Sequence, residues 1–407
     1  MSLRPLLSFA MALTAFAMLM APSTADALPR MSATSGAPCS TCHYNSDGGG
    51  IRSDIGFDTA AHTGAIGHDQ TGLSILDERE TNRALDWLAT GMDVRYQMAR
   101  FGEPGVEFDL DAEEAVVTTP DRRIIPMQYQ LYALIDPASF VDVYASYALG
   151  PDIREGDFCS TVYDGQTCVQ SHAHLKPFGH SGPSMRAGFM RPSMGLRHDD
   201  HTMLTYADAS QSQPVIIPPN YAELGVEASY QPRHWLRAEA GGFRADQLSD
   251  ALGDEDLVSA SDPAYLGRVT YLPNFDFGVD RAFYGWIGAS VYGAGSFRAD
   301  QLFTALGWLD RGALQFELTH LDYGSDSDRR GLNLATIGTY NLRDWLVLQG
   351  RLEQSQMRAE DTDTRRSAVA SLHFYPVPFA KILPEYRYTR TDDWEMGQYT
   401  VQLHFFY

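Results

Sequence analysis

The amino-acid sequence predicts an all-β fold, a transmembrane antiparallel β-barrel of about 16 strands preceded by a small N-terminal segment. Three observations predict it. From about Trp87 onward, apolar and polar residues alternate in segments of roughly ten residues, the spacing of barrel strands. Ionised side chains recur on the polar face of these segments, and short turns alternate with longer acidic connections.

The composition excludes two other classes of protein. The chain has 407 residues, of which 44% are hydrophobic, and a formal net charge of −21. So large an excess of negative charge argues against nucleic acid as a partner, because phosphates must be neutralised by a basic surface. After the N-terminus no apolar run reaches the roughly 18 residues of a membrane-spanning helix, which excludes a helical membrane protein.

The N-terminus has the anatomy of a secretory signal peptide, residues 1–27. Arg4 begins a short basic region, residues 6–20 are almost wholly apolar, and Ala25-Asp26-Ala27 offers a small-x-small cleavage site. A single membrane anchor is the alternative, but the apolar stretch is short and a cleavage site follows it. We therefore expect an exported chain that begins at Leu28.

The most specific motif in the exported chain is a Cys-x-x-Cys-His run formed by Cys39, Cys42 and His43. Two thiols at this spacing can form thioethers with both vinyl groups of one haem, and the adjacent histidine then lies under the iron as proximal ligand. A zinc site would need a second close pair, whereas Cys159 and Cys168 are nine residues apart. A thioredoxin-like pair would need a βαβ context that the sequence does not predict. We therefore predict one covalent haem c.

The other axial ligand of this iron should be a histidine or a methionine. His62 and His68 follow the motif in a Gly-rich stretch, and His62 is slightly favoured as the distal ligand. Met31 and an iron with five ligands are the alternatives. Residues 28–86 are too short to bury a haem and a core of their own, so we expect this cytochrome c-like segment to lean on the barrel.

Residues 87–407 supply the barrel strands, each with one apolar and one polar face. In residues 92–98, Met, Val, Tyr and Met alternate with Asp, Arg and Gln. The same split occurs in residues 222–228, 314–319 and 346–353. A soluble β-sandwich could also alternate, but it would seldom repeat the pattern so often. We expect the polar face of every strand to line a wet lumen and the apolar face to meet lipid.

The connections give a strand count. Short ones predict periplasmic turns at residues 231–234, 309–312, 341–344 and 376–379, and longer acidic ones predict outer loops around 245–262, 323–328 and 357–364. Counting back from a last strand that descends to the periplasm gives fifteen readable strands. Because bacterial single-chain barrels have even numbers of strands, one more is expected between residues 150 and 182, which makes sixteen; fourteen is the alternative.

Two residue pairs carry weaker predictions. Cys159 and Cys168 predict a loop disulfide, because an exported chain reaches an oxidising compartment. His198 and His201 flank two carboxylates and could hold a transition metal such as iron, although a charged loop would look the same. No Gly-rich phosphate loop or nucleophile elbow points to hydrolytic chemistry.

One internal repeat lies in the barrel region. The six residues from Phe243 to Leu248 recur from Phe297 to Leu302. By the strand count, both copies are expected at the outer end of an ascending strand, one hairpin apart.

The sequence resembles the fused monohaem cytochrome–porins of the outer membrane, whose best-known members are iron oxidases. The resemblance rests on the signal peptide, on the Cys39, Cys42 and His43 motif after Pro38, and on a barrel that ends in residues 402–407. It implies an outer-membrane protein with a single covalent haem c and, in one version, activity as a ferrous iron:cytochrome oxidoreductase.

A lipid bilayer is an insulating layer about 30 Å thick, so a haem held only in the periplasm could not exchange electrons with the outside. We therefore expect residues 28–86 to plug the barrel and pass electrons between an extracellular donor or acceptor, such as a metal ion, and a periplasmic carrier. The alternative belongs to another class: a diffusion porin with a haem plug that gates it or senses redox state.

Overall fold

The structure is a computed structural model. It describes residues 42–44, 51–66, 81–101, 105–109, 114–118, 121–149, 167–178, 182–198, 203–209, 216–217, 221–276, 282–308, 311–324, 329–359 and 362–407. The predicted signal peptide, Cys39, His68, Cys159 and His201 lie outside these residues.

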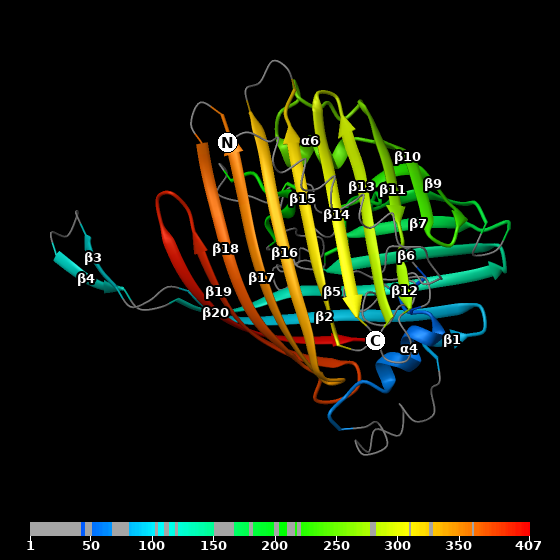
Figure 1. Cartoon of the computed structure of the whole chain (residues 1–407), viewed down its shortest axis with the longest axis horizontal. Helices are drawn as coiled ribbons and strands as arrows, with labels where there is room; N and C mark the ends of the chain where they lie inside the picture. Colours follow the sequence, from blue (N-terminus) through cyan, green and yellow to red (C-terminus); the bar gives the residue numbers. More distant parts are fainter. Residues whose placement is uncertain are drawn as a thin grey trace.

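Sixteen strands form one closed antiparallel barrel (Figure 1). They are β2 (Leu88–Phe101), β5 (Asp121–Ala138), β6 (Val141–Leu149), β7 (Val169–Leu175), β8 (Ser184–Met190), β9 (Glu223–Arg233), β10 (Leu236–Arg244), β11 (Pro263–Tyr271), β13 (Ala282–Ala294), β14 (Phe297–Trp308), β15 (Gly312–Asp322), β16 (Arg330–Arg343), β17 (Leu346–Arg358), β18 (Thr362–Phe374), β19 (Ala380–Arg390) and β20 (Glu395–Phe406).

Each barrel strand pairs with its neighbours in the chain, and β2 closes the circle. One edge of β2 pairs with β5, from Leu88↔Ile135 to Phe101↔Asp121, and its other edge pairs with β20, from Asp93↔Phe406 to Phe101↔Gln398. The predicted count of sixteen is confirmed. The strand that parity required between residues 150 and 182 is β7.

The remaining elements are short. Two strands extend the barrel sheet, β1 (Arg83–Leu85) and β12 (Asn274–Asp276), and two form a separate hairpin, β3 (Gly105–Asp109) and β4 (Glu114–Thr118). The helices are α4 (Asp54–Ala61), the 3₁₀ turn η3 (Leu204–Tyr206) and α6 (Asp246–Leu252). Within the described ranges, no helix is long and apolar enough to cross a bilayer.

The barrel is inside out compared with a water-soluble protein. In β15, Leu314 and Phe316 are 48% and 37% exposed on the outer face, whereas Glu317 is 1% exposed on the inner face. In β17, Leu352 is 64% exposed and Arg351 only 3%. Apolar side chains that point outward from a closed sheet suit hydrocarbon rather than water, so the predicted alternation is confirmed.

The two ends of the barrel differ in the length of their connections. At one end, tight turns such as Asp344–Trp345 between β16 and β17 join the strands, and the last residue, Tyr407, lies beside them. We call this the short-turn end. The opposite, long-loop end carries α6. Residues 191–198, 203–209 and 216–217 fold into the barrel and are together called the inward segment.

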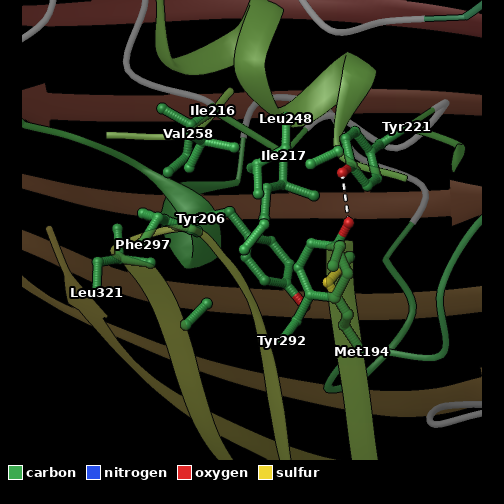
Figure 2. Close-up of a cluster of buried hydrophobic side chains, with 14 of the residues drawn as sticks. Met194, Tyr206, Ile216, Ile217, Tyr221, Leu248, Val258, Tyr292, Phe297 and Leu321 are labelled. Carbon is green, nitrogen blue, oxygen red and sulfur yellow. Dashed lines mark hydrogen bonds between the residues drawn. The ribbon is translucent and has the colours of Figure 1, made fainter. Parts of the chain in front are cut away.

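The interior at the long-loop end is apolar. Met194, Tyr206 and Ile216 of the inward segment pack with Leu248 of α6 and with inward-facing strand residues such as Tyr292 (Figure 2). This cluster is the largest apolar core among the described residues. A polar inner face was predicted for every strand, and at this end the prediction is wrong, because the inward segment covers the wall and excludes water.

The two copies of the internal repeat adopt different structures. From Phe243, the first copy leaves β10 and starts α6, whereas the second copy, from Phe297, lies wholly in β14. Because β14 descends from the long-loop end, the expectation that both copies end an ascending strand is wrong for the second. Its β conformation is held by β13, which pairs with all of it.

Candidate functional site

The N-terminal segment packs on the short-turn end of the barrel, where Figure 1 shows α4 beside the C-terminus. The hydroxyl of Ser53 caps α4 by accepting a hydrogen bond from Gly56 N at 3.2 Å. The buried ring of Phe57 lies 4.9 Å from the ring of Phe379, in the β18–β19 turn, and 5.4 Å from the ring of Tyr407. Aromatic packing therefore fixes α4 to the β18–β19 turn and to the last residue of the barrel.

The end of the Cys-x-x-Cys-His motif is held directly against α4. Ser53 N donates to the carbonyl oxygen of Cys42 at 3.1 Å, and His43 forms a β-bridge with Arg52. A Cβ at position 56 would overlap the carbonyl oxygen of Cys42, so only glycine permits this approach. The ring of His43 is buried, with 7% of the residue exposed.

Arg83 joins the segment to the barrel wall. Its guanidinium donates to the phenol oxygen of Tyr44 and forms ion pairs with Asp54 of α4 at 3.5 Å and Asp136 of β5 at 2.8 Å. Burial raises the pKa of the Tyr44 phenol to about 12, so this phenol stays neutral under ordinary conditions. The contact beside the motif is therefore a cation on a neutral phenol, with two carboxylates to balance the charge.

The described part of the motif fits a haem in the kind of donors it offers. Cys42 is a free, half-buried thiol, and its burial raises its pKa, an effect that Arg52 partly offsets. His43 supplies a buried imidazole directly after it. One thiol for a thioether and one imidazole for iron are thus in place, and the second thiol, on Cys39, lies outside the described residues.

Of the two candidates for the distal ligand, only His62 lies within the described residues. His62 is the C-terminal cap of α4, its side chain is 63% exposed, and its Nδ1 lies 3.4 Å from a carboxylate oxygen of Asp58. His68 lies outside the described residues. The structure therefore places His62 on the exposed end of the helix, and a ligand role for either histidine stays a prediction.

The inward segment crosses the inner wall from β9 to β17. The backbone N–H of Gly195 donates to Ser290 Oγ of β13 at 2.9 Å. Further along, Asn333 of β16 donates to the carbonyl oxygens of Thr205 and Ala207 at 3.2 and 2.8 Å. Asp208 then accepts from the hydroxyl of Tyr323 at 3.1 Å. Contacts at both ends and in the middle fix the segment inside the barrel.

Three wall glutamates hold the backbone of this segment. Glu227 of β9 accepts from Ser193 N at 3.0 Å, Glu317 of β15 from Leu196 N at 3.4 Å, and Glu353 of β17 from Leu204 N at 2.9 Å. Glu227 also pairs with Arg186 of β8 at 2.6 Å. Their carboxylates are thus used to dock a loop rather than to face an open lumen.

Gly195 permits the close approach at the middle anchor. Its φ is +46°, a left-handed conformation that favours glycine, and a Cβ there would overlap the Glu317 carboxylate. The sequence prediction missed this loop packing. A signal was present, because glutamate recurs at inward positions of β9, β15 and β17, but nothing in the sequence shows that a loop would reach them.

The remaining predicted site residues are only partly placed. Nε2 of His198 lies 2.8 Å from Glu317 Oε2, whereas His201 is outside the described residues. Within the described ranges, no three His, Cys, Asp or Glu side chains gather to hold a metal ion. Cys168 is disulfide-bonded, but Cys159 is outside the described residues, so the predicted pairing and the predicted loop metal site both stay predictions.

Comparison with known proteins finds similarity of fold alone. No protein-family model matches the chain, and no curated protein matches it. Among solved structures, OprB of Pseudomonas putida is similar with a TM-score of 0.52 at 10% identity, over 79% of this chain and 94% of that one. The outer-membrane channel DcaP of Acinetobacter baumannii has a TM-score of 0.50 at 11% identity, over 79% and 97%. A loop-deletion mutant of OmpT, an outer-membrane protein of Vibrio cholerae, has a TM-score of 0.50 at 11% identity, over 79% and 99%. The barrel therefore has the fold of outer-membrane porins.

Proposed function

We propose that the protein is an outer-membrane channel for small polar solutes, narrowed by the inward segment. One observation carries the proposal: a closed barrel with an apolar outer face holds a loop against its inner wall by hydrogen bonds to Glu227, Glu317 and Glu353. A bonded loop gives a passage of fixed width, whereas a free loop would give a variable one. The porin fold of the structural neighbours supports the same function.

The test is conductance of the mature chain in planar lipid bilayers. We expect unitary current steps of constant size, and larger steps when the chain from Pro192 to Asp208 is replaced by a short Gly-Ser link. Proteoliposomes that neither swell in small sugars nor conduct ions would contradict the proposal.

The N-terminal segment gives this channel its second feature, a cover at the short-turn end. α4 packs on Phe379 and Tyr407, and Arg83 ties the segment to Asp136 of β5. Porins have short turns on the periplasmic side, so we propose that this cover faces the periplasm. The matched test compares Arg83→Gln with Arg390→Gln, a change remote from α4. Arg83→Gln alone should raise conductance and speed proteolysis within residues 45–80.

A second function is favoured by the position of the motif. Cys42 and His43 lie in this cover, at the mouth of the only passage that a barrel offers through an insulating membrane. We propose that Cys39 and Cys42 hold a haem c by thioethers and that His43 ligates its iron, with His62 or His68 as distal candidates. When bound, the haem would supply one-electron redox chemistry. The chain's own residues would bind it, shield His43 from water and hold it at the mouth.

This function makes the protein an electron conduit between an extracellular partner, such as ferrous iron, and a periplasmic carrier. Its first test is pigment in protein from a strain competent in c-type haem maturation. Mass spectrometry should find one haem on wild type and on His62→Ala, and none on Cys42→Ala.

A second experiment separates the two functions. Proteoliposomes with an enclosed electron acceptor are given ferrous iron outside. Electron transfer without solute leakage supports the conduit function. Solute leakage without electron transfer supports only the channel function. If the wild-type protein is colourless and holds no haem, the proposed conduit function is wrong. The proposed channel function is then decided by the conductance test alone.

A further inference from the structure

Two pairs of arginines face outward near the long-loop end of the barrel. Arg330 of β16 lies directly opposite Arg358 of β17, and Arg366 of β18 lies directly opposite Arg390 of β19. All four are exposed and lie on the same face of their strands as the outward apolar residues. Like charges directly opposite each other destabilise a sheet, so an anion that binds between them would stabilise both pairs.

The outward residues between the two pairs are polar and uncharged. On β17 they are Gln354 and Gln356, and on β18 they are Thr362 and Thr364. We call these four residues and the four arginines the outer patch. Its side chains offer guanidinium, amide and hydroxyl groups, all of which can donate hydrogen bonds.

Three described carboxylates adjoin the outer patch, and they keep their negative charge. Asp322 lies opposite Arg330, and Glu395 lies opposite Arg390. Asp392 accepts a hydrogen bond from the backbone of β18 at 3.0 Å. All three lie at the edges of the patch, so the positive charge is concentrated in its middle.

The middle of the patch is formed by Arg358 and Arg366. Their cross-strand neighbours are arginine, glutamine or threonine and not a carboxylate: Arg330, Thr362, Gln354 and Arg390. Within the described residues, neither Arg358 nor Arg366 forms an ion pair. The guanidinium groups of this pair therefore face outward without a carboxylate from the chain between them.

The outer patch begins where the apolar band of the outer face ends. Two residues from Arg366 toward the middle of the barrel, Ala368 lies opposite Leu352, which is 64% exposed. Leu332 follows Arg330 in the same way and is 36% exposed. The arginines thus start at the level where hydrocarbon gives way to lipid headgroups, and their long side chains can reach those headgroups.

Phosphate is the anion that lipid headgroups present at this level. The planar guanidinium group can bond two oxygens of one phosphate, and such charge-assisted hydrogen bonds are strong. Arg358 lies opposite Thr362, four residues from Arg366, which corresponds to about 14 Å along the strand. The two arginine pairs therefore offer two separate positions for phosphate.

We propose that the outer patch binds the phosphate groups of anionic lipids in the leaflet at the long-loop end. The binding gives one side of the barrel, from β16 to β19, a preference for such lipids. This inference goes beyond the proposed channel and conduit functions, because it concerns the outer face alone.

Trp394 can report on lipid at this place. It is 44% exposed in the β19–β20 turn, and the centre of its ring lies 5.7 Å from the guanidinium carbon of Arg365. Asp392 joins the same turn to Thr364 of β18, two residues from Arg366. Lipid bound at Arg366 is therefore expected to lie near the indole ring.

The experiment measures how strongly brominated lipid quenches Trp394, taken as the difference between wild type and Trp394→Phe. The full mature chain is placed in phosphatidylcholine vesicles in which part of the lipid is brominated, as phosphatidate or as phosphatidylcholine. Brominated phosphatidate should quench the wild type more strongly. Arg366→Gln should lower this preference by roughly fivefold, the effect of one arginine beside anionic lipid. Arg366→Lys should keep part of it, because the charge remains and the paired hydrogen bonds are lost.

Arg298→Gln is the matched control. Arg298 is also exposed at the long-loop end, but it forms an ion pair with Asp300 at 2.7 Å. Its replacement should leave the preference for phosphatidate unchanged. Inorganic phosphate in the buffer should not compete, because it lacks the acyl chains that hold a lipid against the barrel.

Three outcomes would overturn the proposal. They are equal quenching of the wild type by the two lipids, equal effects of Arg366→Gln and Arg298→Gln, and loss of the preference when inorganic phosphate is added. If Arg366→Gln does not give the heat-resistant band of a folded barrel, the wild type and Arg366→Lys still decide. The measurement needs neither current nor haem, so its result is independent of the channel and conduit tests.

Discussion

At the residue scale, Gly56 of α4 packs directly against the backbone of Cys42. The helix can lie this close only because position 56 has no Cβ. The same approach brings Ser53 N to the carbonyl oxygen of Cys42. The close packing of the motif against α4 therefore depends on the absence of a side chain at position 56.

Gly56→Ala tests this dependence. The added methyl must push α4 away from Cys42, which should destabilise the segment by about 1–3 kcal/mol. We expect faster proteolysis between residues 45 and 80 while the heat-resistant barrel band in gel electrophoresis is kept. Gly338→Ala is the matched control, because a Cβ there meets no atom. Equal proteolysis of the two variants would contradict the close contact.

Three buried tyrosines outside the strands, Tyr206, Tyr221 and Tyr323, give a dependence on pH. Burial raises the pKa of each phenol above its usual value of about 10. Because the folded state then holds these protons more tightly than the unfolded state, their contribution to stability is complete below about pH 10. It is lost as the pH rises through the folded pKa values.

An alkaline titration, followed by the absorbance of tyrosinate, checks that stability is lost as the pH rises. A late group of tyrosines, which includes Tyr206, Tyr221 and Tyr323, should ionise only as the barrel unfolds. Tyr323→Phe should shrink the late phase by one tyrosine. A single reversible phase for the whole chain would show that these phenols are not buried.

At the element scale, the inward segment is held by carboxylates on three strands, and Glu227 carries the most contacts, with Ser193 and Arg186. Glu227→Gln removes the carboxylate that pairs with the buried Arg186 at 2.6 Å, which should destabilise the docked segment by about 3 kcal/mol. We expect noisier, flickering current in bilayers and protease cleavage within the segment.

Glu385→Gln is the control for this change, because Glu385 pairs only with Arg387 among its described contacts in β19, away from the inward segment. If both variants give the same quiet current as wild type, the glutamates do not hold the segment.

Strands were predictable from sequence because each carries its own local signal. Alternation of apolar and polar residues gave most of them. The even strand number of bacterial single-chain barrels gave β7, whose residues 169–175 alternate weakly. The inward segment was not predictable, because the glutamates that anchor it lie on β9, β15 and β17. The first and the last of these glutamates are more than a hundred residues apart in the sequence. Its Met194, Ile216 and Ile217 have no strand period, and their burial depends on where the chain returns.

The internal repeat shows the same limit. The six residues from Phe243 and from Phe297 are identical, and yet Leu248 is fully buried in α6 whereas Leu302 is 51% exposed on β14. The neighbouring strand β13 decides the second case. At the N-terminus, the motif could be recognised from three residues, but its contact with Gly56 and its position beside Phe379 required the fold.

At the scale of the whole molecule, the outer face of the barrel should tolerate a charged residue less well the deeper that residue lies in the bilayer. Leu352 lies in the middle of β17 and is 64% exposed, and Leu342 lies near the short-turn end of β16 and is 41% exposed. Leu352→Arg should destabilise the barrel in lipid by about 2–4 kcal/mol, and Leu342→Arg by at most about 1 kcal/mol. Urea unfolding in vesicles measures both. Equal small effects would show that this face does not meet hydrocarbon.

Tyr407 sits at the seam where the barrel closes. Its backbone exchanges hydrogen bonds with Met92 of β2 at 2.8 and 3.0 Å, and its ring meets Phe57 of α4. Part of the surface on which α4 packs is therefore complete only when the barrel has closed. Before β2 pairs with the end of the chain, α4 lacks its contact with Tyr407, so we expect the Cys-x-x-Cys-His segment to be held less tightly than in the closed barrel. We expect any covalent loading to precede closure, in a fixed order of assembly that the fold itself imposes.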